Sequence, residues 1–243
     1  EHHVLQIAQL RLQRAQLLGY QTHAHFLLEE RMAQTPEKLQ IFLQDLLRKA
    51  KPAAQREFDE LSTFAKQLHQ LEKLEKWDGA YYSEKLKQEK FSLDDELLKP
   101  YFELSRVLHG AFRVADKLFD LRFSEVYNID KYHEEVQTFE VHNAKGALVA
   151  ILYADFFPRK GKRNGAWMTS FKPQYKKNGL NERPHVSIVC NFTRPTPTKP
   201  SLLTFNEVTT LFHEFGHALH GMLADTTYPN LSGTSVFWDF VEL

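Results

Sequence analysis

The sequence is poor in cysteine, and this limits the structures that it can form. Cys190 is the single cysteine among 243 residues, which excludes an internal disulfide and a zinc cluster built from several cysteines. Chains without disulfides fit a reducing compartment. We therefore expect a cytoplasmic protein, with the periplasm as the alternative because the chain opens on Glu1 rather than on an initiator methionine.

Net charge and long apolar runs are also lacking. Lysine plus arginine and aspartate plus glutamate number 31 each, so the chain has no surplus of positive charge with which to hold nucleic acid. No stretch comes near the roughly 18 consecutive apolar residues of a membrane-spanning helix. We expect neither a nucleic-acid partner nor a membrane partner, and the sequence leaves the oligomeric state open.

Helical patterns fill the first half of the chain, up to about residue 122. Thr35 before Pro36 predicts one helix start, Pro52 predicts a break in the long helical stretch that follows, and Ser92 predicts another start. Helical patterns also run up to both ends of the chain. We therefore expect a piece of a longer protein, truncated at both ends.

From residue 123 to residue 203 the pattern changes to short alternating runs, which are typical of strands. Two runs flank a turn signal from Asn143 to Gly146, and two more lie in "GAWMTSF" and "PHVSIVCNF". We therefore predict a mainly α fold with a small antiparallel β-sheet of about four strands. The last of these runs, residues 185–192, could offer a free strand edge to an extended peptide.

Residues 204–243 contain the best-specified helix of the sequence. Thr204 and Glu207 match the capping box, a reciprocal pair of side-chain hydrogen bonds at a helix start. An apolar stripe at helical spacing follows, made of Phe205, Val208, Phe212, Phe215, Leu219 and Met222. The sequence predicts an amphipathic helix that buries this stripe.

On this helix the motif "HEFGH" places a glutamate directly after the first of two histidines. His213 and His217 are four residues apart, so both imidazoles extend from one face and can reach one metal ion. Glu214 lies about 100° round the helix, where it can take a proton from a metal-activated water. In a chain with twelve histidines a chance match is expected on the order of a few per cent of the time, so a merely histidine-rich helix is the alternative.

A catalytic zinc ion needs a third protein ligand and an open position for water. The spacing leaves Asp239 and Glu242 as candidates, since either carboxylate can fold back toward the histidine pair. His220 lies on the ligand face, but a fourth protein ligand would fill the open position, so we expect it beside the ligands. Gly216 within the helix predicts close packing against it, and Gly233 predicts a turn.

Several stretches resemble the thimet oligopeptidase family of zinc peptidases, and together they extend over essentially the whole chain. They are "RAQLLGYQTHAHFLLEERMAQTP", "LKPYFEL", "YADFFPRKGKRNGAWM", "VCNFTRPTPTKPSLLTFNEVTTLFHEFGHALHG" and "LSGTSVFWDFVEL". Within the family they are most similar to the bacterial peptidyl-dipeptidase branch.

The resemblance implies a zincin-like, mostly helical fold with a deep channel that admits only short, unfolded peptides. It implies one zinc ion per chain, bound by His213 and His217, and it places the third ligand on Glu242. Glu214 is then the general base, which takes a proton from the zinc-bound water and passes it to the leaving amine. Asp239 and Gly233, like His220, are expected to surround the ligands.

The implied activity is the release of C-terminal dipeptides from short peptides. The alternatives are an endo-acting oligopeptidase of the same family, a zinc hydrolase of non-peptide amides, and a non-catalytic helical scaffold that binds peptides and has a structural or empty metal site.

The resemblance also implies a partial catalytic domain, with a helical part at 1–122, a small sheet with loops at 123–203 and zinc-binding helices at 204–243. The family's C-terminal part supplies a histidine and tyrosines that hold the oxyanion, and it lies beyond Leu243. Because each such donor contributes about 10²–10³ in rate, we expect the isolated chain to be impaired or inactive.

Overall fold

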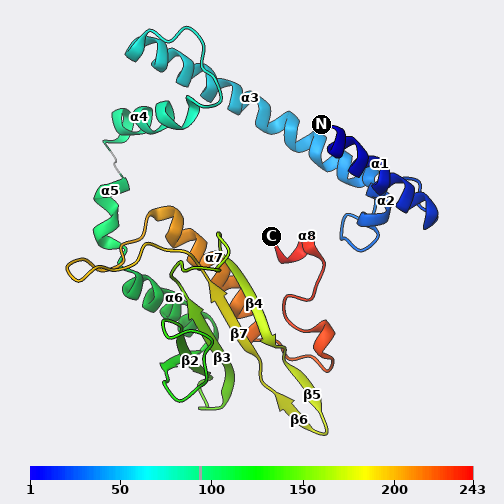
Figure 1. Cartoon of the computed structure of the whole chain (residues 1–243), viewed down its shortest axis with the longest axis vertical. Coiled ribbons are helices and arrows are strands. Elements are labelled where there is room, and N and C mark those ends of the chain that lie inside the picture. Colours follow the sequence, from blue (N-terminus) through cyan, green and yellow to red (C-terminus); the bar gives the residue numbers. More distant parts are fainter. Residues whose placement is uncertain (93–94, 243) are drawn as a thin grey trace. The chain divides into compact units, whose positions relative to one another are not determined.

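The computed structural model describes residues 1–92 and 95–242, and the chain divides into two compact units. The first unit takes in Glu1–Leu93 and Phe237–Leu243, and the second takes in Asp94–Val236. Figure 1 draws the chain with its element labels. Within the described residues, no helix combines the length and the apolar character that crossing a membrane requires.

The first unit consists of helices. They are α1 (His2–Leu17), α2 (His23–Leu28), α3 (Pro36–His69), α4 (Gly79–Phe91) and α8 (Trp238–Val241). The long helix α3 packs against α4 through a small apolar cluster that buries Phe64, Ala65 and Tyr82.

Three positions in this unit test the helix boundaries expected from the sequence. Thr35 caps α3 as predicted, since its hydroxyl accepts a hydrogen bond from the Lys38 backbone N–H at 3.3 Å. The predicted break at Pro52 is wrong: α3 runs through it for 34 residues, because good helix formers on both sides keep the remaining hydrogen bonds. Ser92 is also wrong as a helix start, because it ends α4 in a left-handed conformation with φ of 50°.

The second unit is a sheet covered by helices. Its main sheet has the strand order β1-β2-β3-β7-β4, and β5 and β6 form a separate hairpin. The strands are β1 (Arg122–Glu125), β2 (Gln137–His142), β3 (Leu148–Asp155), β4 (Trp167–Lys172), β5 (Tyr175–Lys177), β6 (Leu180–Glu182) and β7 (His185–Val189). The helices are α5 (Asp95–Leu98), η1 (Lys99–Tyr101), α6 (Leu104–Phe119), α7 (Phe205–Met222) and η2 (Pro229–Leu231).

The sheet is mixed rather than wholly antiparallel. The pairs β1–β2, β2–β3 and β4–β7 are antiparallel as predicted, but β3 and β7 run parallel, with Leu152 opposite Val186. This parallel pair is possible because the long connection between them, which includes β4, returns the chain to the starting end of the sheet. Since β7 lies between β3 and β4, the predicted free edge at residues 185–192 is wrong, and the two edge strands of this sheet are β1 and β4. The mainly α fold with a small sheet is confirmed.

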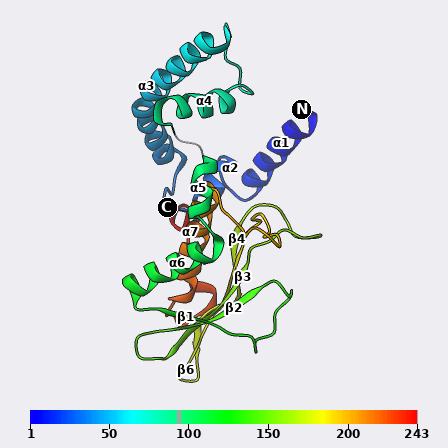
Figure 2. The ribbon, with the colours of Figure 1, turned by 90° about the vertical axis from the view of Figure 1, so that its left-hand side faces the viewer.

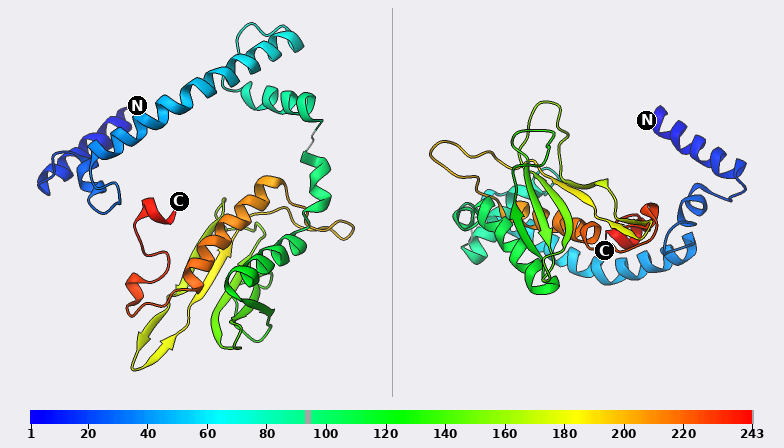
Figure 3. Two further views of the ribbon diagram at one scale, coloured as in Figure 1. Left: turned by 180° about the vertical axis from the view of Figure 1, so that it is seen from behind. Right: turned by 90° about the horizontal axis from the view of Figure 1, so that it is seen from below.

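The main core lies between one face of the sheet and the helices α6 and α7. Figures 2 and 3 show both helices on the same side of the strands. The buried side of α6 repeats at helical spacing and consists of Leu104, Val107, Leu108, Ala111, Phe112 and Ala115. The apolar residues that α7 buries in this core are Leu211, Phe215, Ala218 and Met222.

The start of α7 is as predicted, and its buried side is as predicted in part: Val208, Phe215, Leu219 and Met222 of the stripe pack in the core, and Phe205 and Phe212 do not. The Thr204 hydroxyl accepts from the Glu207 N–H at 3.2 Å, and the Glu207 carboxylate accepts from the Thr204 N–H at 2.8 Å, which completes the capping box. Phe205 and Phe212 of the predicted stripe are 54% and 39% exposed. The reason is that the helix rests on the sheet along a line that begins at Leu211, one position away from Phe212.

Two glycines bring the segment after α7 back onto the helix. Gly233 has φ of 57°, and a Cβ built on it would lie 2.9 Å from the Cα of Gly221 in the last turn of α7. Gly221 is itself confined, because a Cβ there would lie 2.8 Å from the side chain of Met168 in β4. The predicted turn at Gly233 is confirmed. The close packing predicted at Gly216 is wrong, since among the described residues no atom outside its chain neighbours and the adjacent helix backbone lies within 4 Å of a Cβ built there.

A buried carboxylate at the end of β3 holds the loop that follows. Asp155 accepts hydrogen bonds from the Arg159 guanidinium at 2.8 and 2.9 Å, from the Lys162 ammonium at 2.8 Å and from the Tyr132 hydroxyl at 3.0 Å. The side chains of Asp155 and Lys162 are 2% and 3% exposed. Burial raises the pKa of Asp155, but the hydrogen bonds from Arg159 and Lys162 outweigh it, and the net pKa lies below the ordinary value.

We expect Gly233→Ala to lower the free energy of unfolding by about 2–4 kcal/mol, measured by urea unfolding. A left-handed backbone costs a non-glycine residue about 1–2 kcal/mol, and the added methyl group meets the backbone of Gly221, which cannot turn aside. Gly146→Ala is the matched control, because Gly146 also has a positive φ, of 76°, but has open space around it. Equal losses in the two variants would contradict a strained contact between Gly221 and Gly233.

We expect Asp155→Asn to lower the free energy of unfolding by about 3 kcal/mol at pH 7, because it leaves the Lys162 ammonium buried without its charge partner. A lowered folded-state pKa means that this stabilisation is present above the unfolded pKa of about 4 and is lost as pH falls through the folded value. The difference in the free energy of unfolding between wild type and Asp155→Asn should therefore become smaller below about pH 4. The exposed Asp116→Asn in α6 should change stability by less than about 0.5 kcal/mol. If this difference stays constant with pH, the charged Asp155 carboxylate is not the source of the stabilisation.

Candidate metal centre

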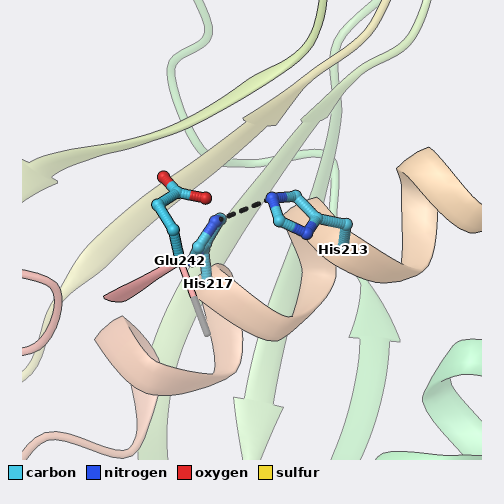
Figure 4. A group of neighbouring side chains, drawn as sticks. All are labelled: His213, His217 and Glu242. Atoms are coloured by element: carbon cyan, nitrogen blue, oxygen red, sulfur yellow. Dashed lines mark hydrogen bonds between the residues drawn. The ribbon is translucent and has the colours of Figure 1, made fainter. Parts of the chain in front are cut away.

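Two imidazoles converge on the side of α7 that faces away from the sheet. The Nε2 atoms of His213 and His217 are 3.0 Å apart, and the two ring planes are nearly perpendicular, at 84° (Figure 4). His213 is exposed and His217 is half-buried. The helical spacing of the motif therefore gives the side-by-side arrangement that the sequence predicts.

The separation of these two nitrogens suits a shared cation. Two nitrogens bound to a tetrahedral zinc ion at 2.0–2.1 Å lie about 3.3 Å apart, so the observed pair needs only a small outward movement to bind one ion. Two unprotonated ring nitrogens at this distance direct their lone pairs toward each other, which a proton or a metal ion between them relieves. The donor set thus fits zinc.

The seating of α7 explains why the imidazoles are accessible. With Leu211, Phe215 and Met222 against the core, the opposite side of the helix carries both histidines of the motif and Gly216 between them. Gly216 has no side chain, and the space beside it is open. His220 lies three residues beyond His217 on the same helix and is half-buried.

Glu214 differs from its neighbours in the motif because it is only 7% exposed. Its carboxylate acts on Cys190, directly after β7: burial, and then the charge of Glu214, raise the pKa of that thiol to about 12. A thiol with so high a pKa stays protonated at neutral pH and is not a nucleophile. Cys190 therefore has a packing role.

The two carboxylates that the spacing left open as third ligand differ in their surroundings within the first unit. Asp239 accepts hydrogen bonds from the backbone N–H groups of Met32 and Ala33, each at 3.0 Å and each on a different oxygen. Glu242 directly follows α8 as its C-cap residue, and it is exposed. It lines a surface hollow together with Leu28, Arg31, Ala33, Leu39, Trp238 and Asp239. Both oxygens of Asp239 are thus hydrogen-bonded to the backbone.

Sequence reasoning missed the partners of Asp239, although it singled out Asp239 itself. Met32 and Ala33 lie 207 and 206 residues away from Asp239 in the chain, and no local sequence pattern near Met32 or near Asp239 predicts the contact. The sequence also gave no role to Gly221, the residue against which Gly233 packs. A glycine in the last turn of a core helix was the only signal available for that contact.

Comparison with known proteins agrees with the peptidase family that the sequence resembles. The sequence profile of peptidase family M3 matches residues 1–243. The chain is 42% identical over 240 residues to oligopeptidase A of Salmonella typhimurium and 40% identical over 244 residues to dipeptidyl carboxypeptidase of Escherichia coli. It is 35% identical over 246 residues to a thimet-like oligopeptidase of Dictyostelium discoideum.

These matches take in nearly all of this chain but only a part of each relative. They extend over 98% of the chain for the two bacterial proteins and 96% for the Dictyostelium protein, and over 35%, 35% and 36% of the relatives' own lengths. The chain therefore spans about a third of the length of the relatives that it matches. Identities of 42% and 40% are too close to separate the oligopeptidase A and dipeptidyl carboxypeptidase branches. The resemblance found in the sequence is confirmed, and the chain belongs to peptidase family M3.

Proposed function

We propose that the protein to which this chain belongs is a zinc-dependent metallopeptidase that hydrolyses short peptides. The observation that carries this proposal is the pair of imidazole nitrogens 3.0 Å apart on the accessible side of α7. Membership in peptidase family M3 supports it, and so do relatives named as oligopeptidases and a dipeptidyl carboxypeptidase. The activity is proposed for the whole protein, since this chain spans about a third of those relatives.

We propose His213, His217 and Glu242 as the ligands of one zinc ion, the three side chains drawn in Figure 4. Two imidazoles and one carboxylate form a catalytic zinc site that keeps a fourth position open. His220 is proposed to lie beside the ligands, because a fourth protein donor would fill that position. Asp239 is proposed to lie beside the ligands rather than to bind the ion, because both of its oxygens already accept hydrogen bonds from backbone N–H groups.

When bound, the zinc ion would supply Lewis-acid activation of a water molecule and of the scissile carbonyl. Glu214 would take the proton from the attacking water and deliver it to the leaving amine. Its low exposure suits this role, because bulk water is kept from competing for the proton. The ligand histidines would bind through Nε2 and carry their proton on Nδ1, which fixes the tautomer of each ring.

The proposed cleavage mode is the release of C-terminal dipeptides, with internal cleavage of short peptides as the alternative. The names of the relatives include both kinds of enzyme. A peptide with an amidated C-terminus distinguishes the two modes, because dipeptide release needs the free terminal carboxylate and internal cleavage does not.

We further propose that the chain is part of a catalytic domain, in which residues 1–122 supply helices, 123–203 a sheet with loops and 204–243 the metal-binding segment. The isolated chain is expected to be impaired or inactive in cleavage. The proposed compartment is the cytoplasm, with the periplasm as the alternative.

In the full-length parent protein, Glu214→Gln is expected to retain one zinc ion per chain. The rate of peptide cleavage should fall by a factor of about 10²–10⁴, which is the usual contribution of a general base. Zinc is measured by atomic emission, and cleavage of short peptides by mass spectrometry. The matched control is Glu207→Gln on the same helix, because glutamine preserves the accepting oxygen of the capping box. It should stay within about twofold of wild-type activity.

The rival functions give different outcomes in the same experiment. A non-catalytic scaffold would show no cleavage in the parent, and Glu214→Gln would then change nothing. A hydrolase of other amides would not be inhibited by a panel of short peptides. A fully folded parent that binds no zinc would end the proposal.

A further inference from the structure

The short helix α8, which directly precedes Glu242, is held by a loop from the start of the chain. The carboxylate of Asp239 in α8 accepts the Met32 N–H on Oδ1 and the Ala33 N–H on Oδ2, both at 3.0 Å. Two successive backbone N–H groups that point at one carboxylate form a small anion-binding concavity. The N–H of Met32, followed by that of Ala33, lowers the pKa of Asp239, so the carboxylate is charged at neutral pH. These two hydrogen bonds join α8 to the loop that contains Met32 and Ala33.

The loop presents these N–H groups in a defined conformation. The Arg31 N–H donates to the Leu28 carbonyl at 3.2 Å, and the Gln34 N–H donates to the Arg31 carbonyl at 3.1 Å. Gln34 adopts a left-handed φ of 64°, after which Thr35 caps α3. The loop is thus bounded by a hydrogen-bonded turn on one side and by a helix cap on the other.

A second contact joins the same two segments. The guanidinium carbon of Arg31 lies 5.1 Å from the ring centroid of Trp238, the first residue of α8. The Phe237 carbonyl accepts from the N–H groups of Phe240 and Val241 at 3.0 and 3.1 Å, which makes α8 a closed turn. Adjacent residues, Trp238 and Asp239, therefore fix one end of this turn, and Glu242 lies immediately beyond its other end.

We propose that Asp239 is a positioning residue for Glu242, and that the loop containing Met32 and Ala33 thereby belongs to the metal-binding part of the protein. This inference rests on the proposed role of Glu242 as the third zinc ligand. A ligand on a fixed turn loses less conformational freedom when it binds the ion than one on an unconstrained segment. Partners that orient metal ligands typically contribute about 10–100-fold in metal affinity.

The test is a double-mutant cycle on zinc affinity, measured by competition with a chromophoric chelator. Asp239→Asn keeps the shape of the side chain but replaces one accepting oxygen with an NH₂ group. We expect it to weaken zinc binding about 10-fold when Glu242 is present. In the Glu242→Ala background the same change should stay within about twofold, because no carboxylate is left to position. Asp45→Asn, at a half-buried aspartate on α3 of the same unit, is the control and should leave zinc affinity unchanged.

Trp238→Ala tests the positioning role independently, since it removes the contact between the Trp238 ring and the Arg31 guanidinium. It should weaken zinc binding in the presence of Glu242 and not in its absence. Each result has a separate meaning. If Glu242→Ala does not weaken zinc binding, the proposed ligand set fails. If Glu242→Ala weakens it but Asp239→Asn does not, or if Asp239→Asn weakens it equally in both backgrounds, the positioning role alone is overturned.

Discussion

The seating of α7 on the sheet is the constraint on which the rest of the second unit depends. Leu211, Phe215 and Met222 decide which side of the helix meets the strands, and this choice leaves His213 and His217 on the accessible side. A rotation by one residue, about 100°, would carry the imidazoles toward the core. The apolar contacts that stabilise the helix therefore also leave both imidazoles accessible.

Both ends of α7 are fixed by polar groups, so the helix cannot slide along the sheet. At its start the capping box joins Thr204 and Glu207. At its end the Arg183 guanidinium donates to the Met222 carbonyl at 2.8 Å and to the Val149 carbonyl in β3 at 2.7 Å, which ties the last turn to the sheet. A cation at this end also suits the helix dipole.

The carboxylates of this chain show how similar groups come to serve different purposes. Asp155 and Asp239 are both held by hydrogen bonds, but their partners differ. Asp155 is enclosed by the cations of Arg159 and Lys162, whereas the oxygens of Asp239 accept from two backbone N–H groups. The surroundings, rather than the residue type, therefore decide how each of these two carboxylates is held.

The sequence by itself determined the features that depend on neighbouring residues: the caps at Thr35 and Thr204, the turn from Asn143 to Gly146 and the spacing of the histidine pair. The hairpin turn at Asn178-Gly179 carries an equally local signal. Only the tertiary structure decided that β7 pairs parallel with β3, that Leu211 rather than Phe212 is buried, and that Asp239 binds a loop 206 residues away. The reason is physical, because caps, turns and helical spacing follow from backbone geometry within a few residues. Strand partners, the buried side of a helix and long-range hydrogen bonds depend on which distant surfaces meet.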